Sequence, residues 1–326
     1  AAHTSVRPPE AMKRAREEPS PTLEYASSCF FPTTWLEVPL VNVIPHNHDT
    51  SIFEFGLPDG VSLDLPVCAC ILMCAPGREH TEGDAVRPYT PISTNEMTGK
   101  FQLLVKCYQQ WGDPDKRISN LVDSFKPAGA VSMWLHELAI GSPVKFKHIP
   151  FNIKLAYPFT GVNTITMCAV GAGIAPMIQA LHKLLKTPGD TTQIVLLYGN
   201  RSVKDILLYD QLEEWQAEHK DRLKVVYCVG SRWGAERVYM NYKANSAPPP
   251  PPEGFETLPE GRRMQGWVKD TSLKKYAFPP AEDTRVFVCG LPSVYDALCG
   301  PRTDKQLEEG TVLARMGYTT PMVVKF

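Results

Sequence analysis

The pattern of apolar residues changes once along this 326-residue chain, and that change constrains the fold more than any other feature of the sequence. Between residues 35 and 150, apolar residues gather in short strand-like runs that are separated by turn residues. From residue 164 onward, strand-like runs alternate with segments of helical periodicity. Short strands in succession predict an antiparallel barrel or sandwich, and the alternating pattern predicts a parallel sheet covered by helices. We therefore expect a β domain followed by an α/β domain.

The expected domain boundaries follow this change of pattern. We predict a charged, proline-broken tail over residues 1–30, a β domain over 31–150, a linker over 151–163 and an α/β domain over 164–326. One helix is expected in the β domain, around residues 131–139. Five consecutive prolines mark an insertion at about residues 245–260, which predicts an extended, solvated loop of the polyproline type. A docking site for a partner protein is the alternative for this insertion.

The overall composition bears on nucleic-acid binding and on membrane insertion. The chain has 34 basic and 35 acidic side chains, so its formal charge of -1 does not predict nucleic-acid binding. The longest apolar run, residues 67–75, has nine residues and is far shorter than the ~20 needed to cross a bilayer. We therefore expect membrane attachment only through a segment that this chain lacks.

The nine cysteines predict reduced thiols rather than a disulfide framework, because most of them stand in apolar, strand-like runs. Cys68 and Cys70 lie two residues apart on one face of such a run, which is a poor arrangement for binding a metal ion. His46 and His48 have no further ligands nearby in the sequence, so we expect them on a solvated loop. The sequence predicts no metal site.

The run RPYTPIS, residues 87–93, is the sharpest local motif, and it lies between two expected strands of the β domain. Its arginine offers a planar fork for phosphate, its tyrosine a flat ring, and its threonine and serine two hydroxyl groups. This grouping suits a ligand with a phosphate and a planar heterocycle. An ordinary proline-stiffened edge strand is the alternative, since Pro88 and Pro91 cannot donate to a neighbouring strand.

Two glycine-containing segments come directly before expected helices. Gly129 and Ser132 precede or open the helix of the β domain, where free amides attract phosphate and Ser132 is expected to cap the helix. Gly171, Gly173 and Pro176 follow a strand and open a helix, which is typical of a turn that approaches a pyrophosphate. An ordinary helix cap and a steric βα turn are the respective alternatives.

A thiol ends one of the expected parallel strands. Cys289 is followed by Gly290 and Pro292, and the carboxyl ends of parallel strands form the ligand crevice of α/β domains. The thiol is therefore expected to face that crevice, with a buried cysteine at a strand end as the alternative. Paired acid–base carboxylates and a Ser-His-Asp order are absent from the sequence pattern, which does not support hydrolysis.

Taken in order, these motifs resemble those of the ferredoxin reductase superfamily, and most closely those of the NADH–cytochrome b5 reductases. The resemblance rests on RPYTPIS, LVKCY, GAVSMWL, GAGIAPM, YGNRSVKDILL and CGLP, with NHDTSIFEF near the start and the aromatic carboxyl terminus Phe326. It covers roughly residues 36–326.

The resemblance implies a Greek-key β-barrel that binds FAD, followed by a Rossmann-like α/β domain that binds NADH. The positions that match the family's FAD motifs are Arg87, Pro88, Tyr89, Thr90, Ser93, Val105, Lys106, Tyr108, Gly129, Val131 and Ser132. The positions that match its nicotinamide motifs are Gly171, Gly173, Pro176, Cys289, Gly290 and Pro292. Thr90, which would bond near the reactive flavin nitrogen, and Cys289, which would lie beside the nicotinamide ring, are the implied catalytic residues.

The implied reaction is hydride transfer from NADH to FAD, followed by single-electron transfer to cytochrome b5 or a similar haem acceptor. A related reductase that uses NADPH or a different haem or ferric acceptor is the first alternative. A nucleotide-sensing interaction protein without turnover is the second. The resemblance also implies a cytosol-facing enzyme, tethered to the endoplasmic reticulum or the mitochondrial outer membrane.

The chain departs from the family pattern at several places. Cys68-Ala69-Cys70 stands where relatives have Gly-Gln-His, Ala172 and Ala175 replace threonines, and residues 148–159 replace a glycine-rich run near the FAD adenosine. Gly230-Ser231-Arg232 stands where NADH-preferring relatives have an aspartate that would repel a 2′-phosphate. We expect NADH as the donor on the overall resemblance, with NADPH as the alternative.

Overall fold

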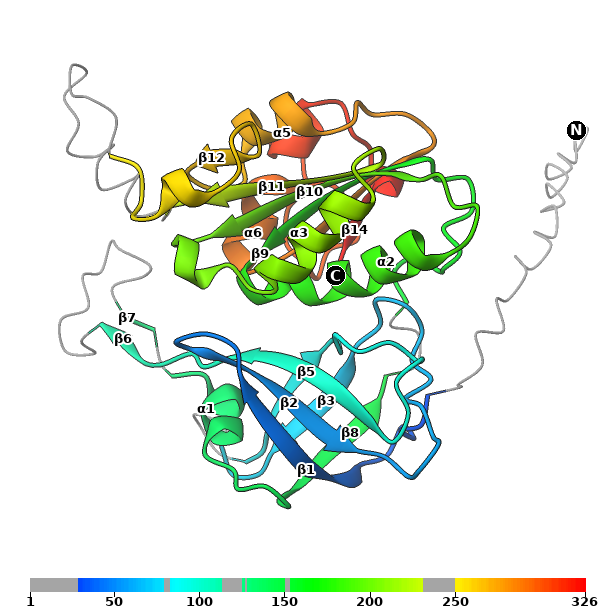
Figure 1. Ribbon diagram of the computed structural model, residues 1–326, viewed down its shortest axis with the longest axis vertical. Helices are drawn as coiled ribbons and strands as arrows, with labels where there is room; N and C mark the ends of the chain where they lie inside the picture. The colour runs from blue at the N-terminus through cyan, green and yellow to red at the C-terminus, as the bar shows by residue number, and fades with distance from the viewer. Residues whose placement is uncertain (1–28, 79–82, 113–124, 127, 150–152, 231–249) are drawn as a thin grey trace, which may run out of the picture.

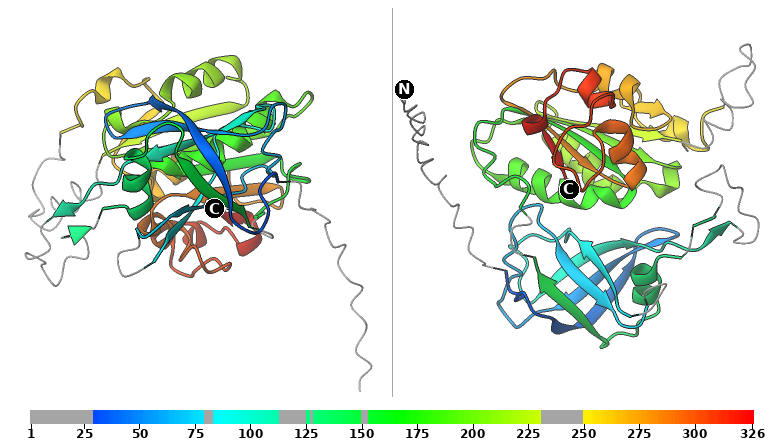
Figure 2. Two further views of the ribbon diagram at one scale, coloured as in Figure 1. Left: turned by 90° about the horizontal axis from the view of Figure 1, so that it is seen from below. Right: turned by 180° about the vertical axis from the view of Figure 1, so that it is seen from behind.

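The computed structural model describes residues 29–78, 83–112, 125–126, 128–149, 153–230 and 250–326. A β-barrel domain and an α/β domain are stacked on each other, and helix α2 of the second domain faces the barrel (Figure 1). Seen from behind, the carboxyl terminus lies on the face of the α/β domain that is turned toward the barrel (Figure 2). Of the predicted tail over residues 1–30, residues 1–28 lie outside the described residues, as do Ser231 and Arg232. Cys29 and Phe30, the last two residues of that tail, pack against the barrel core.

The first domain is built on a curled antiparallel sheet, as the sequence predicts. Its strands are β1 (Leu36–Pro45), β2 (Thr50–Gly56), β3 (Ile71–Ala75), β4 (Ala85–Tyr89), β5 (Lys100–Lys106) and β8 (Pro143–His148). The spatial order is β4-β3-β8-β1-β2-β5, so β4 is an edge strand, as the prolines of RPYTPIS predict. The backbone N–H of Ile92, just past β4, donates to the carbonyl of Gln102 on β5, which draws the two edges together.

The barrel interior is filled by aromatic side chains from several strands. Phe55, Phe101 and Phe146 are almost fully buried, and their ring centroids lie 4.8–5.3 Å apart. The predicted helix is α1 (Ala130–His136), and strands β6 (Trp111–Gly112) and β7 (Phe125–Lys126) form a small separate ladder.

The second domain has a parallel sheet of six strands with helices on both faces. Its strands are β9 (Thr164–Val170), β10 (Gln193–Asn200), β11 (Leu223–Val229), β12 (Arg263–Gln265), β13 (Thr284–Cys289) and β14 (Val323–Lys325), in the order β12-β11-β10-β9-β13-β14. Helices α2 (Ile174–Lys186) and α3 (Tyr209–Glu218) pack on one face. Helices α5 (Asp270–Tyr276), α6 (Pro292–Leu298) and α7 (Val312–Arg315) pack on the other. Strands buried on both faces explain the nearly continuous apolar runs of this half of the sequence.

Three local predictions are wrong. The apolar run over residues 67–75 is strand-like in sequence, but β3 begins only at Ile71, and residues 66–69 form a turn in which Cys68 has a φ of 63°. The sequence pattern over residues 205–219 predicts one helix, but α3 begins only at Tyr209, because Val203–Asp205 forms a separate 3₁₀ turn and Leu208 has a left-handed φ of 56°. The end of the proline-rich insertion is not solvated, since Leu258 is 3% exposed and belongs to the domain core.

Among the described residues, no helix is long and apolar enough to cross a membrane. All nine cysteines lie in the described part of the chain, and none of them is joined in a disulfide there.

Candidate functional site

The motif RPYTPIS runs from the edge strand β4 toward the junction of the domains. Arg87 and Pro88 are exposed, and one guanidinium nitrogen of Arg87 donates to the carbonyl of Val86 at 2.8 Å. Tyr89 and Thr90 are half-buried, and burial raises the pKa of the Tyr89 phenol. The arginine fork and the adjoining ring therefore lie at the surface of the barrel, where a ligand can reach them.

The hydroxyl of Ser93 is held by the barrel. Ser93 is buried, and its Oγ accepts a hydrogen bond from the backbone N–H of Gln102 at 2.9 Å. This hydroxyl therefore stabilises the end of the motif against β5. Its predicted contact with a ligand stays a prediction.

Tyr108 and the start of α1 form one unit at the end of β5. The backbone N–H of Gly129 donates to the carbonyl of Tyr108 at 2.7 Å, and the backbone N–H of Tyr108 donates to Ser132 Oγ at 3.3 Å. The prediction that Ser132 caps α1 is wrong: it lies inside the helix, and its hydroxyl donates back to the carbonyl of Gly129 at 3.2 Å. A Cβ on residue 129 would lie 2.4 Å from this hydroxyl oxygen, so any larger residue here would displace the Ser132 hydroxyl from its bonds.

Two of the predicted FAD-binding residues have side chains that face away from any ligand. Val105 and Val131 are each 2% exposed and pack in the barrel core. Both can contact a cofactor only through their backbone, because their side chains are taken up by packing.

The glycine turn after β9 presses against the end of β13. Gly171 has a φ of 54°, and a Cβ built there would meet no atom within 4 Å. A Cβ on residue 173 would lie 2.3 Å from the carbonyl oxygen of Cys289, so the two backbones touch directly. Pro176 lies in the first turn of α2, as predicted. Gly171 thus leaves open space beside the turn, and Gly173 brings the turn to Cys289.

Cys289 ends β13 at the predicted crevice. Burial raises the pKa of its thiol to about 11, so the thiol is protonated at neutral pH and acts as a neutral packing group. Gly290 follows it, and Pro292 starts α6. The carboxyl-terminal Phe326 lies beside this strand end, since its backbone N–H donates to the carbonyl of Val288 at 3.0 Å.

Asn200 is a residue of the crevice that the sequence analysis missed. It ends β10 and is 6% exposed, and neither atom of its amide has a hydrogen-bond partner among the described residues. Buried amide groups without a partner are rare in proteins and call for an explanation. A polar ligand in the crevice at the carboxyl ends of β9, β10 and β13 would supply that partner, so the site fits a bound dinucleotide. The sequence signal that could have identified Asn200 is a polar residue at the end of an apolar, strand-like run.

Gly230 occupies a backbone position that excludes a side chain. Its φ is 147°, and a Cβ there would lie 3.1 Å from the backbone of Gly266. The aspartate of NADH-preferring relatives would require this backbone to move. Ser231 and Arg232, which belong to the predicted departure at this place, lie outside the described residues, so NADPH as the alternative donor stays a prediction.

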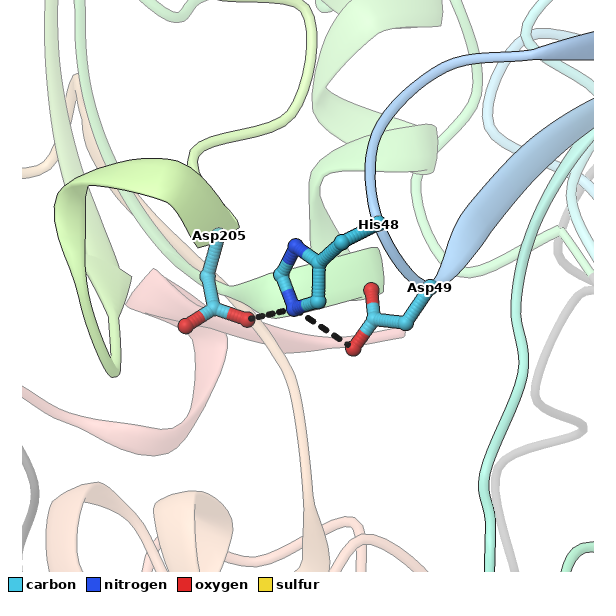
Figure 3. A group of neighbouring side chains, drawn as sticks. All are labelled: His48, Asp49 and Asp205. Carbon is cyan, nitrogen blue, oxygen red and sulfur yellow. Dashed lines mark ion pairs between the residues drawn. The ribbon is translucent and has the colours of Figure 1, made fainter.

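A charged contact joins the two domains beside the site. The ammonium group of Lys106, predicted to line the flavin, lies 2.6 Å from an oxygen of Asp49 in its own domain and 3.1 Å from an oxygen of Asp205 in the other. His48 Nε2 lies 3.4 Å and 3.6 Å from the same two carboxylates (Figure 3). Because Lys106 pairs with both carboxylates and the guanidinium of Arg201 pairs with Asp205 as well, two cations already balance the two carboxylates, and we assign no metal to this cluster.

The loop that carries His46 and His48 is not simply solvated, contrary to the prediction. His46 Nε2 accepts a hydrogen bond from the backbone N–H of Leu208 at 3.0 Å, and Asn47 Nδ2 donates to the carbonyl of Lys204 at 3.1 Å. Burial lowers the pKa of His46, which favours the neutral ring that this bond requires. The loop thus belongs to the domain junction.

Comparisons with known proteins agree with this division of the chain. Residues 37–150 match the oxidoreductase FAD-binding domain family, and residues 167–248 match the oxidoreductase NAD-binding domain family. An NADH-cytochrome b5 reductase-like protein of Arabidopsis thaliana is 34% identical over 97% of this chain and 82% of its own length. NADH-cytochrome b5 reductase 1 of Bos taurus is 30% identical over 90% of this chain and 87% of its own length. The cytochrome b5 reductase domain of Ulva prolifera nitrate reductase superposes with a TM-score of 0.67 at 27% identity, and the match covers 90% of this chain and 98% of that domain.

Proposed function

The chain belongs to the NADH–cytochrome b5 reductase family, and on that premise we propose that it passes electrons from NADH through FAD to cytochrome b5. One observation carries the proposal. The Gly171–Gly173 turn of the NAD-binding domain lies beside strand β5 of the FAD-binding domain and packs directly against the backbone of Cys289. Segments predicted to hold the two cofactors therefore meet at a single place.

The FAD-binding residues come from the barrel. We assign the FAD phosphates to the Arg87 guanidinium, which is exposed at the barrel surface, and to the start of α1, where the first backbone amides of the helix have no acceptor within the helix. Tyr89 offers a ring for packing, and Thr90 offers a hydroxyl at the domain junction. When bound, FAD accepts a hydride from a nicotinamide and releases electrons singly to a haem protein.

The NADH-binding residues come from the crevice of the α/β domain. The open space beside Gly171 suits a pyrophosphate, and the unpartnered amide of Asn200 offers a donor and an acceptor. Cys289 contributes a neutral thiol beside the nicotinamide position. The protein therefore contributes to catalysis by binding the two ring systems and orienting them toward each other.

The experiment is anaerobic stopped-flow mixing of the FAD-loaded protein with NADH and, separately, with NADPH. We expect loss of flavin absorbance that is faster with NADH, and then its return when oxidised cytochrome b5 is added. Arg87→Met should weaken FAD binding by ~10- to 100-fold, the size of one or two charge-assisted hydrogen bonds. Arg285→Met is the matched control, because this arginine bonds carbonyls at the opposite end of β13. Failure of the wild-type protein to bind FAD, or to be reduced by either nucleotide, refutes the proposal.

The haem acceptor and the cellular location extend the proposal beyond the chemistry of the site. If the acceptor is acidic, its reduction should slow as salt is added, because screening weakens charge complementarity between exposed groups. A similar rate with an unrelated haem or ferric acceptor would favour the alternative acceptor class. Attachment to the cytosolic face of the endoplasmic reticulum or mitochondrial outer membrane stays a prediction from the family.

A further inference from the structure

One buried amide side chain crosses from the α/β domain into the barrel domain. Gln179 of α2 is 6% exposed. Its Oε1 accepts from the backbone N–H of Cys68 at 3.1 Å. Its Nε2 donates to the carbonyl of Pro91 at 2.8 Å and to the carbonyl of Ser93 at 2.9 Å. All three partners belong to the barrel domain, so this side chain is bonded to the domain opposite its own.

The partners of Gln179 lie in the segment proposed to hold FAD. Pro91 and Ser93 are the fifth and seventh residues of RPYTPIS, and their carbonyls are bound from the side of α2. On its other side the same segment is bonded to β5 through Ile92 and Ser93. The end of the motif is therefore held between its own barrel and the helix of the neighbouring domain.

Gln179 also stands on the helix that extends from the proposed nucleotide turn. The turn ends at Gly173, and Gln179 lies in the second turn of α2. A helix of this length transmits position rigidly, because its backbone hydrogen bonds leave little freedom between the two points. A second bond supports the same contact, since Cys68 Sγ lies 3.1 Å from the carbonyl oxygen of Pro176.

We propose that Gln179 is a positioning residue that sets the nicotinamide-binding turn relative to the flavin-binding motif. The inference rests on the proposed function. It adds what fixes the distance between the two binding segments. Misplacement of reacting groups by about 1 Å can cost as much as ~10²-fold in rate, so such a contact has kinetic consequences.

This contact differs in kind from the charged contact of Lys106 and Asp205. Lys106 and Asp205 attract each other as full charges, whereas Gln179 is buried, neutral and bonded to fixed backbone groups. Salt screens exposed charges and acts little on buried neutral hydrogen bonds. The positioning effect of Gln179 should therefore persist in high salt.

The test compares Gln179→Met with Gln216→Met in the FAD-loaded protein. Methionine keeps the length of the side chain and removes its polar atoms. Gln216 is the matched control, because this helical glutamine also bonds backbone groups, the carbonyl of Leu223 and the N–H of Val225, but within its own domain. At saturating NADH, Gln179→Met should slow flavin reduction by at least ~10-fold, with the Kd for NADH changed by less than about threefold. Gln216→Met should leave both values near wild type.

A second readout does not depend on activity. Cys68 is 6% exposed and its backbone N–H is bound by Gln179, so loosening of the contact should expose its thiol. Modification by N-ethylmaleimide, mapped on peptides by mass spectrometry, should be faster at Cys68 in Gln179→Met than in wild type or Gln216→Met. The measurement works in protein with or without bound NADH.

Gln179→Glu supplies a conservative variant with a pH signature. An ionised carboxylate would face the carbonyls of Pro91 and Ser93 without a proton to donate, whereas a protonated carboxyl can donate to one of them. Flavin reduction in this variant, relative to wild type, should recover as the pH falls from about 8 to about 6. A role confined to packing would show no such recovery.

The outcomes separate this inference from the proposed function. Wild-type rates of flavin reduction and of Cys68 modification in Gln179→Met would overturn the positioning role, even in an active reductase. A wild-type protein that NADH does not reduce would refute the proposed function. In that event faster modification of Cys68 in Gln179→Met would still establish the contact between the domains, without its kinetic role.

Discussion

Replacing Asp205 with asparagine should cost about 2 kcal/mol of unfolding free energy at neutral pH. Burial alone would raise the pKa of this carboxyl, but hydrogen bonds from Ser202 and Lys106 and the charge of Lys106 outweigh it and hold the pKa at about 2, against an ordinary value of 3.8. A difference of that size is worth about 2 kcal/mol at ~1.4 kcal/mol for each pH unit. The side chain is 5% exposed, so solvent screening takes little from this value.

The stabilisation has a defined pH dependence. The folded pKa lies below the unfolded one, so the contribution is fully present above the unfolded pKa and is lost as the pH falls through the folded pKa of about 2. The destabilisation caused by Asp205→Asn should therefore shrink to roughly half at about pH 3.

Urea unfolding of wild type and Asp205→Asn at about pH 7 and about pH 3, followed by circular dichroism, measures both values. Free energies of successive transitions are summed, because two domains need not unfold in one step. Asp221→Asn is the control, since Asp221 is exposed. A loss below about 0.5 kcal/mol at neutral pH, or an equal loss at both pH values, would refute the reasoning.

Two further predictions concern the crevice. Gly173→Ala places a Cβ 2.3 Å from the carbonyl oxygen of Cys289, so it should destabilise the protein by ~1–3 kcal/mol and weaken NADH binding in a calorimetric titration. Gly173 has an ordinary right-handed helical backbone with a φ of -64°, so the loss reports the steric contact alone, and a loss below about 0.5 kcal/mol with unchanged NADH binding would contradict the close contact. Because the pKa of the Cys289 thiol is raised to about 11, its modification by iodoacetamide should accelerate ~10-fold per pH unit between about pH 7 and about pH 10. A rate that levels off above about pH 9 in peptide mass mapping would show that the thiol ionises normally.

The architecture could be predicted from the sequence because it follows from local periodicity. Short strands in the first half and alternating strands and helices in the second correspond to two sheets of different type, and Pro88 marked β4 as an edge strand. Short elements such as β12 and β14 were missed, since three residues carry too little periodicity to be recognised. The turn at Cys68 was missed because its residues are as apolar as the strand that follows.

The contacts between the domains could not be predicted, because they join residues far apart in sequence. The three partners of Gln179, namely Ser93, Pro91 and Cys68, are 86, 88 and 111 positions away from it in the sequence. The residue that donates to His46 is 162 positions away from it. A glutamine in an amphipathic helix and a histidine in a polar loop have many uses, and no local pattern distinguishes among them. For Gly173 the motif indicated a close approach, and the structure shows that a protein carbonyl is one of its partners.

The position of β8 has a consequence for synthesis of the chain on the ribosome. This strand is the last of the barrel in sequence, yet it lies between β1 and β3 and pairs with both. A nascent chain that ends before residue 143 therefore leaves two strands with open edges, which are sites of unwanted pairing. The barrel can close only after β8 has left the ribosome, by which time synthesis has passed into the NAD-binding domain.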